Sequence, residues 1–212
     1  MSLPEWHSVI NNLVQEQGAT SAVPNVYAFA TVEDRAPRVR HVIHRGFSPS
    51  GLFLATTDRR MPKATQLDNN PAASIAWYFS VSWTQVRVVG TAFTYPGGHP
   101  PTAETPEYWE HERERLFERG IGPALKASFA RPEAPGTLLK DAPPAITWPT
   151  ELGREGFENP EEQAQLAFAH SNFCILALDP TMVEVLELKC TPHRRTAWTL
   201  RDGTWVKEEL VP

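Results

Sequence analysis

Hydrophobic and polar residues alternate along much of the chain. The run QVRVVGTAFTY at 85–95 places apolar side chains at most alternate positions, which is the period of a half-buried β-strand, and the apolar run VYAFATV at 26–32 predicts another strand. The same pattern predicts further strands at 38–46, 51–56, 73–79, 173–178, 182–188, 195–200 and 205–210. Antiparallel strands with short turns at regular spacing indicate a barrel or sandwich.

Helical spacing appears at four places. Near the N-terminus, apolar residues recur every three or four positions in a helix that Ser2 opens and Gly18 ends. Further helices are predicted at 63–69, at 106–118 and from Asn159 to about His170. We expect the EHERER run inside 106–118 to form a solvated face. The strands around Asp179-Pro180 are expected to be two, and Asp202-Gly203 predicts a hairpin turn.

The middle of the chain differs from the rest. It contains the charged helix and a Pro-rich connector over 131–149. We therefore expect one domain over 1–212, mainly β with flanking helices (α+β), with a helical and Pro-rich insertion at about 96–171.

Composition narrows the possible functions. A net charge of −5 and a pI near 5.8 argue against a nucleic-acid-binding protein. No apolar run has the length of a membrane span, and the N-terminal residues do not resemble an export signal. Cys174 and Cys190 lie in apolar strand-like surroundings, so we expect buried free thiols in a reducing cytoplasm.

Basic, hydroxyl and amide side chains gather at the ends of the predicted strands. They are Arg40, Arg45, Thr56, Thr57, Arg60, Lys63, Gln85 and Arg87. Arginine offers a planar pair of donors and lysine a point charge, so together they suit a bound phosphate. Each of them alone also fits an ordinary solvated surface.

His41 and His44 do not predict a metal site. Residues three apart on a strand face opposite sides, and the segment supplies no third ligand. We expect ordinary strand histidines and no metal.

The order of these residues resembles the pyridoxamine 5'-phosphate oxidase-like family of FMN-binding split barrels. The resemblance lies in the segments RHVIHRG at 40–46, ATTD at 55–58, KATQLDNNP at 63–71, TQVRVVG at 84–90 and CTPHRR at 190–195. The run Trp77-Tyr78-Phe79 and the T-D-x-R spacing are closer to an uncharacterised FMN-binding branch than to the oxidase itself.

The resemblance implies an antiparallel FMN-binding split β-barrel that forms a homodimer, with FMN in two clefts at the interface. Its implied cofactor contacts are Arg40 and Lys63 at the 5'-phosphate, Thr56 or Thr57 as hydroxyl donor, Arg60 as a weaker candidate, Val42, Ile43 and Gln85 at the ring or ribityl chain, and Arg195 from the partner subunit. Arg45 and His193 would face the substrate.

The substrate half of the family pattern is eroded. Leu186 stands where the oxidase has a tryptophan, and the substrate arginine is replaced by Thr191 or Pro192. The oxidase's substrate-binding Tyr, Arg and Ser are not found in the middle segment. We therefore expect an FMN-dependent oxidoreductase acting on an unidentified small molecule, whose catalytic residues the sequence does not assign. The alternatives are a pyridoxamine/pyridoxine 5'-phosphate oxidase, a non-catalytic flavin- or haem-binding protein, and a split barrel without a cofactor.

Overall fold

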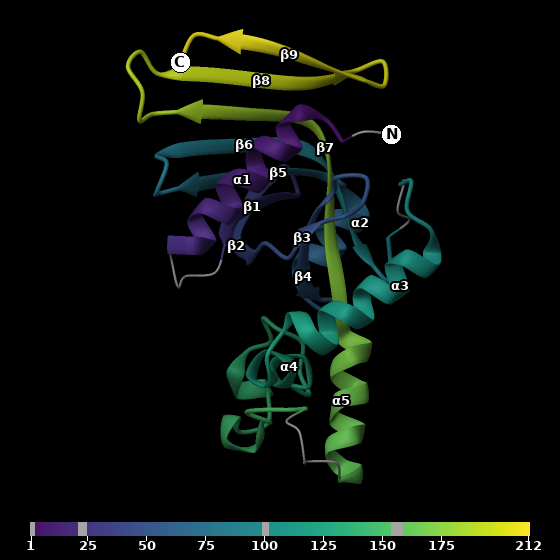
Figure 1. Ribbon diagram of the computed structural model, residues 1–212. Helices are drawn as coiled ribbons and strands as arrows, with labels where there is room; N and C mark the ends of the chain where they lie inside the picture. Colours follow the sequence, from purple (N-terminus) through teal and green to yellow (C-terminus); the bar gives the residue numbers. More distant parts are fainter. Residues whose placement is uncertain (1–2, 21–24, 99–101, 154–158) are drawn as a thin grey trace. The chain divides into compact units, whose positions relative to one another are not determined.

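The computed structural model describes residues 3–20, 25–98, 102–153 and 159–212. Within them the helices are α1 Glu5–Thr20, α2 Pro62–Asn69, α3 Pro106–Arg115, α4 Pro123–Phe129 and α5 Pro160–Asn172 (Figure 1). The strands are β1 Val26–Glu33, β2 Ala36–Ile43, β3 Gly46–Phe47, β4 Phe53–Asp58, β5 Ala72–Phe79, β6 Thr84–Tyr95, β7 Phe173–Glu187, β8 Arg194–Arg201 and β9 Thr204–Leu210.

In the described part of the chain, nine strands form one antiparallel sheet. Its order is β2-β1-β5-β6-β7-β4-β3, with β8 on β7 and β9 on β8. The path ends at β2 on one side and β3 on the other, so the sheet is open rather than closed. This arrangement confirms the predicted mainly β, antiparallel split-barrel fold with flanking helices.

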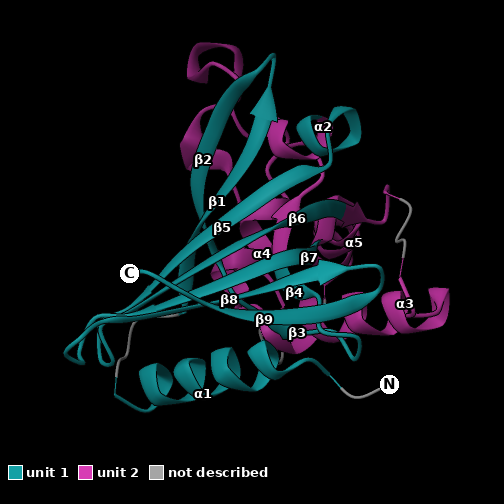
Figure 2. Cartoon of the chain, turned by 90° about the horizontal axis from the view of Figure 1, so that it is seen from above, with its two compact units in different colours: residues 1–55, 66–93, 177–212 teal, residues 56–65, 94–176 magenta. Residues whose placement is uncertain are grey.

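The chain divides into two compact units, coloured separately in Figure 2. Unit 1 comprises residues 1–55, 66–93 and 177–212, and unit 2 comprises 56–65 and 94–176. The prediction of a single domain with an insertion at about 96–171 stays a prediction. None of the described helices combines the length and the apolar composition needed to cross a membrane.

The core of unit 1 follows from the strand alternation. In β1, Tyr27 and Phe29 point inward and are almost fully buried, whereas their neighbours are partly exposed. Helix α1 adds Trp6, whose ring stacks on Phe53 with centroids 5.7 Å apart. The helix continues through Gly18 to Thr20, so the predicted end at Gly18 is wrong, and Ser2 lies outside the described residues.

The core of unit 2 is built by helices α3 to α5 around Trp109, Phe129 and Phe173. The expectation of a solvated EHERER face is wrong for Glu112 and Arg113, which are both buried. Arg113 Nε donates to the carbonyl of Phe173 over 3.0 Å, and Nη2 donates to the carbonyl of His170. Arg113 therefore bonds α3 to the C-terminal end of α5 and to the first residue of β7.

One predicted strand is divided in two in the structure. The strand expected over 38–46 ends at Ile43, and Gly46, with a φ of 117°, begins the separate β3. Between them the His44 N–H donates to the Asn25 carbonyl, and the Arg45 N–H donates to the Leu54 carbonyl. The chain therefore changes hydrogen-bonding partners at this point, which a period-2 pattern does not reveal.

The two strands expected around Asp179-Pro180 form one continuous strand, β7. Gly90 on β6 leaves room for the Asp179-Pro180 backbone of β7. A Cβ on Gly90 would lie 2.0 Å from the Asp179 carbonyl oxygen, so only glycine permits this approach of the two backbones. Helix α4 was not predicted, although Gly122 followed by Pro123 at the first helical position was its available signal.

Several local predictions are confirmed. Asp202 and Gly203 adopt φ values of 48° and 76° and turn β8 into β9. Asn159 caps α5, because its Oδ1 accepts a 2.8 Å hydrogen bond from the Glu162 N–H. Cys174 is buried as expected, whereas Cys190 is partly exposed.

Candidate cofactor site

A buried ammonium and a hydroxyl meet between β4 and α2, within unit 2. Lys63 Nζ donates to Thr57 Oγ1 over 2.8 Å and also contacts Met61 Sδ. Lys63 and Thr57 are 8% and 3% exposed, so the pair is held inside the protein. Thr56 precedes Thr57 on the strand, points to the opposite face and is partly exposed. Of the two threonines in the prediction, Thr57 is therefore the one hydrogen-bonded to Lys63.

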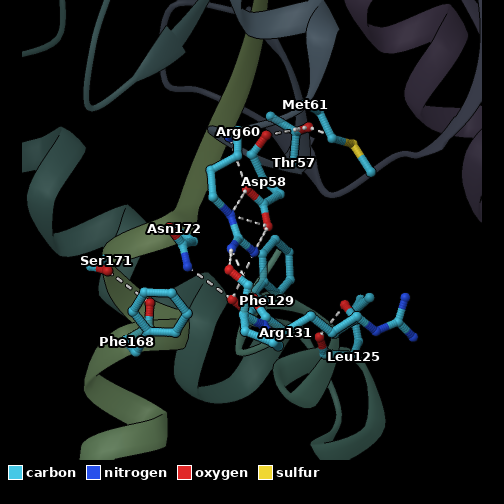
Figure 3. A network of polar contacts seen from close by, with 12 residues as sticks. Thr57, Asp58, Arg60, Met61, Leu125, Phe129, Arg131, Phe168, Ser171 and Asn172 are labelled. Carbon is cyan, nitrogen blue, oxygen red and sulfur yellow. Dashed lines mark hydrogen bonds and ion pairs between the residues drawn. The ribbon is translucent and has the colours of Figure 1, made fainter. Parts of the chain in front are cut away.

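Arg60 lies in the same loop but is engaged by the protein (Figure 3). Its guanidinium forms a two-pronged ion pair with the buried Asp58, with Nη2 2.7 Å from Oδ2. The same group donates to the carbonyls of Phe129 and Arg131 over 3.2 and 2.8 Å. These bonds fix the end of α4 and the start of the Pro-rich connector. In the sequence, Asp58 appears only as part of the T-D-x-R spacing, which does not identify it as the partner of Arg60.

Arg40 belongs to unit 1 and projects from β2. Its Nη1 donates to Thr31 Oγ1 over 2.7 Å, and its Nη2 donates to Gln66 Oε1 over 2.9 Å. Gln66 Nε2 in turn donates to Glu33 Oε1 over 3.2 Å. Burial lowers the pKa of Arg40, and the nearby Glu33 carboxylate opposes that shift. The guanidinium is thus oriented by two side chains, Thr31 on β1 and Gln66 on α2, and Gln66 is itself bonded to Glu33.

The end of β2 carries the residues expected at the flavin ring. Val42 is buried opposite Tyr27, whereas Ile43, opposite Val26, is partly exposed. Arg45 follows the end of β2 and is half-buried, and burial lowers the pKa of its guanidinium.

His44 packs among aromatic rings in unit 1. Its ring centroid lies 4.8 Å from that of Phe47, 4.9 Å from Trp77 and 6.0 Å from Tyr27. Burial, assisted by the proximity of His7, lowers the pKa of His44 to about 3. His44 is therefore neutral near pH 7 and packs within this aromatic group, whereas His41 is exposed. Across the described ranges, no three His, Cys, Asp or Glu side chains are grouped as a metal ion would require.

Four polar side chains form a connected chain across unit 1, which we call the arginine–glutamate cluster: Gln85, Arg87, Glu184 and Arg195. Arg87 Nη2 donates to Gln85 Oε1 over 3.1 Å, and Arg87 Nη1 lies 3.1 Å from Glu184 Oε1. Arg195 Nη2 donates to Glu184 Oε2 over 2.8 Å. The structure thus brings together Gln85 and Arg195, which the resemblance assigns to opposite subunits. His193, the other C-terminal candidate, is exposed just before β8.

Sequence reasoning did not identify Glu184. Its signal was present in the segment Val183-Glu184-Val185, where a carboxylate occupies a position between two buried valines. Its partners, Arg87 and Arg195, lie about 100 and 10 residues away in the chain, so a local sequence pattern does not reveal the pairing.

Cationic and hydroxyl side chains at the strand ends of an open antiparallel split barrel have the chemistry that suits a phosphorylated ligand. Residues 3–96 match the family model for the FMN-binding domain of pyridoxamine 5'-phosphate oxidase. This match confirms the resemblance seen in the sequence. The matched range contains all the predicted cofactor residues except Arg195.

Individual relatives agree with this assignment. Pyridoxine/pyridoxamine 5'-phosphate oxidase 2 of Arabidopsis thaliana is 26% identical over 184 residues, which cover 83% of this chain and 81% of that protein. A pyridoxamine 5'-phosphate oxidase-related, FMN-binding protein of Nostoc punctiforme is similar in structure, with a TM-score of 0.74, 25% identity, and coverage of 100% and 99% of the two chains. PhzG of Burkholderia lata, crystallised with tetrahydrophenazine-1-carboxylic acid, has a TM-score of 0.64 at 16% identity, covering 97% of this chain and 91% of PhzG, and therefore shares the fold.

Proposed function

We propose that the protein is an FMN-dependent oxidoreductase that acts on a small molecule. The observation that carries the proposal is the buried Lys63–Thr57 pair inside the segment that matches the FMN-binding family. A terminal phosphate is the ligand that an ammonium and a hydroxyl donor suit best. Riboflavin lacks this group, so the donor set favours FMN.

The donor chemistry of the other predicted residues also fits FMN. We propose that Lys63 and Thr57 hold the phosphate, with Arg40 as a further cation. Val42 and Ile43 would contact the ring, and Gln85 would hydrogen-bond the ring or the ribityl chain. Arg60 and Thr56 remain weaker members of the proposed set, because Arg60 is already bonded to Asp58 and Thr56 faces the other side of β4.

Bound FMN would supply the redox chemistry, and the protein binds and orients it. Arg195 would hold positive charge near the ring and so favour its reduced, anionic form. Arg45 and His193 are proposed to face the substrate. Arg45 is half-buried and His193 is exposed, so both can contribute polar contacts at a surface that a small molecule can reach.

We further propose that the protein is a cytoplasmic homodimer. One row of residues on the outer face of the unit 1 sheet supports the dimer: Val39, Ala30, Ser74 and Val89 lie opposite one another on β2, β1, β5 and β6. Val39 and Val89 are 64% and 41% exposed, and Tyr78 on the same face is 54% exposed. A second copy of the chain would cover this apolar surface.

The visible absorption spectrum of the purified protein tests the proposed cofactor. Flavin bands are expected, and mass analysis of the small molecule released by heat should give FMN. A haem spectrum would favour the non-catalytic haem-binding alternative. Release of FAD or riboflavin, or failure of the purified protein to bind added FMN, would contradict the proposal.

A second candidate is pyridoxamine/pyridoxine 5'-phosphate oxidase activity, which is favoured by the name of the Arabidopsis relative and its coverage of most of this chain. Such an oxidase needs a cation to bind the phosphate of its substrate, and the structure argues against Arg113 in that role. Arg113, a cation of the middle segment, is buried and donates to the carbonyls at the end of α5. It is therefore committed to the packing of unit 2.

A further inference from the structure

The arginine–glutamate cluster places its carboxylate deeper in the protein than its guanidinium groups. The Glu184 side chain is 7% exposed, whereas the side chains of Arg195 and Arg87 are 29% and 45% exposed. Three adjacent strands, β6, β7 and β8, supply these residues. The carboxylate therefore lies beneath two guanidinium groups that reach toward the surface of the sheet.

Each carboxylate oxygen of Glu184 contacts a different arginine. Oε1 lies 3.1 Å from Arg87 Nη1, and Oε2 accepts from Arg195 Nη2 over 2.8 Å. A guanidinium is planar, so fixing one of its nitrogens restricts the direction of the remaining donors. One buried carboxylate thus orients two cations, and the three groups together carry a net charge of +1.

The surroundings leave the outer side of Arg87 accessible. On β5, Ala76 lies directly opposite Arg87, and on β1, Ala28 lies directly opposite Ala76. Both side chains are short, so they do not cover the guanidinium. The Gln85 amide extends this chain of polar contacts, because its Oε1 accepts from Arg87 Nη2. The cluster therefore presents cationic and amide donors on one open part of the sheet.

We propose that Glu184 is a positioning residue for the flavin, and that Gln85, Arg87 and Arg195 of one chain are donors to the same ring, in place of the assignment of Gln85 and Arg195 to opposite subunits. The inference rests on the proposed FMN function, because the flavin roles of Gln85 and Arg195 come from it. Glu184 itself would not touch the flavin. It would hold the two guanidinium groups where their positive charge meets the electron-rich edge of the ring.

The variant Glu184→Gln tests the inference. A glutamine amide has one acceptor oxygen where the carboxylate has two, so it must release one of the two arginines. We expect the Kd for FMN to rise about ten-fold, the scale of one lost charge-assisted hydrogen bond. The matched control is Glu208→Gln, which removes a carboxylate from the exposed Arg201–Glu208 pair and should leave the Kd unchanged.

The reduction potential of bound FMN separates positioning from simple charge removal. If Glu184 positions Arg195, its loss moves positive charge away from the ring, and the potential becomes more negative. If Glu184 acts only as a nearby negative charge, its removal makes the potential more positive. We expect the negative shift, and a positive shift or none would overturn the inference.

Arg87→Gln provides a second test that remains available should Glu184→Gln fail to fold. It alters the most exposed member of the three charged groups and leaves Glu184 paired with Arg195. We expect weaker FMN binding, with effects that are not additive with those of Glu184→Gln because the two residues act as one unit. Unchanged FMN affinity in Arg87→Gln, or additive effects in the double variant, would overturn the inference.

The two proposals fail in different ways. Wild-type protein that does not bind FMN contradicts the proposed function. Wild-type protein that binds FMN, together with Glu184→Gln protein of unaltered affinity and potential, contradicts only the role of Glu184.

Discussion

At the residue scale, the environment of a side chain decides its chemistry more than its identity does. His44 sits among aromatic rings, and its Nδ1 is buried without a hydrogen-bond partner in the described part of the structure. The cationic form is therefore disfavoured, which is why the pKa of His44 falls to about 3. Arg40, by contrast, keeps its charge because Thr31 and Gln66 accept its hydrogen bonds.

The depressed pKa of His44 makes the stability of the protein depend on pH. The unfolded chain takes up a proton near pH 6.5, whereas the folded protein does so near pH 3. Stability is therefore complete above pH 6.5 and is lost as the pH falls. Between pH 6.5 and pH 5 we expect a loss of about 2 kcal/mol in the free energy of unfolding.

Urea unfolding of wild-type protein and His44→Phe at pH 7 and pH 5 measures this effect. Phenylalanine keeps the ring contacts and has no group to titrate, so the variant should lose most of the pH dependence. His7, whose pKa is also lowered by burial, would account for what remains. An equal pH dependence in the two proteins would contradict this account of His44.

At the element scale, short-range signals were the ones that the sequence revealed well. The Asp202-Gly203 turn and the Asn159 cap depend on residues within a few positions of each other, and both were predicted. The break between β2 and β3 and the continuity of β7 depend on partners far away in the chain, and both were missed. For the same reason the cationic residues were found by type, but Glu184 and Asp58 were not recognised as their partners.

Gly90 provides a test of how β6 approaches β7. Gly90→Ala would place a methyl group 2.0 Å from the Asp179 carbonyl oxygen, so the two strands must separate. We expect a loss of about 1–3 kcal/mol in the free energy of unfolding, the usual cost of overpacking.

The matched control is Gly18→Ala in α1. A Cβ there meets its nearest side-chain atom, Asn25 Nδ2, at 3.9 Å, and alanine favours the helix. Chemical denaturation should show this variant to be as stable as the wild type or more so. Wild-type stability in Gly90→Ala would mean that the strands do not approach as closely as described.

At the scale of the whole molecule, the outer face of the unit 1 sheet bears on assembly. We expect light scattering at micromolar concentration to give twice the chain mass of 23.7 kDa. Val89→Glu should shift the protein toward the monomer, because it would bury a carboxylate in the proposed interface. A wild-type protein that is monomeric while it carries flavin would contradict the homodimer.

The residues that bind the substrate in the oxidase are largely missing from this chain, and their absence affects the expected oxidase activity. A phosphorylated substrate needs an anion clamp of its own, and Thr191 or Pro192 occupies the position of one of its arginines. Losing such a contact costs about 2–5 kcal/mol, so we expect little or no turnover of pyridoxine or pyridoxamine 5'-phosphate. Steady-state assays of the FMN-loaded protein measure this. Turnover at the rate of a dedicated oxidase would make that oxidase the better assignment.

The central claim of the account is that the chain recognises the phosphate of FMN through Lys63. Its most direct test is the titration of wild-type and Lys63→Ala protein with FMN, riboflavin and FAD, with the partly exposed Lys126→Ala from the same unit as the control. We expect Lys63→Ala to weaken FMN by about 1–3 kcal/mol while riboflavin affinity hardly changes and Lys126→Ala matches the wild type. Equal losses for FMN and riboflavin, or FAD as the tightest ligand, would contradict the claim.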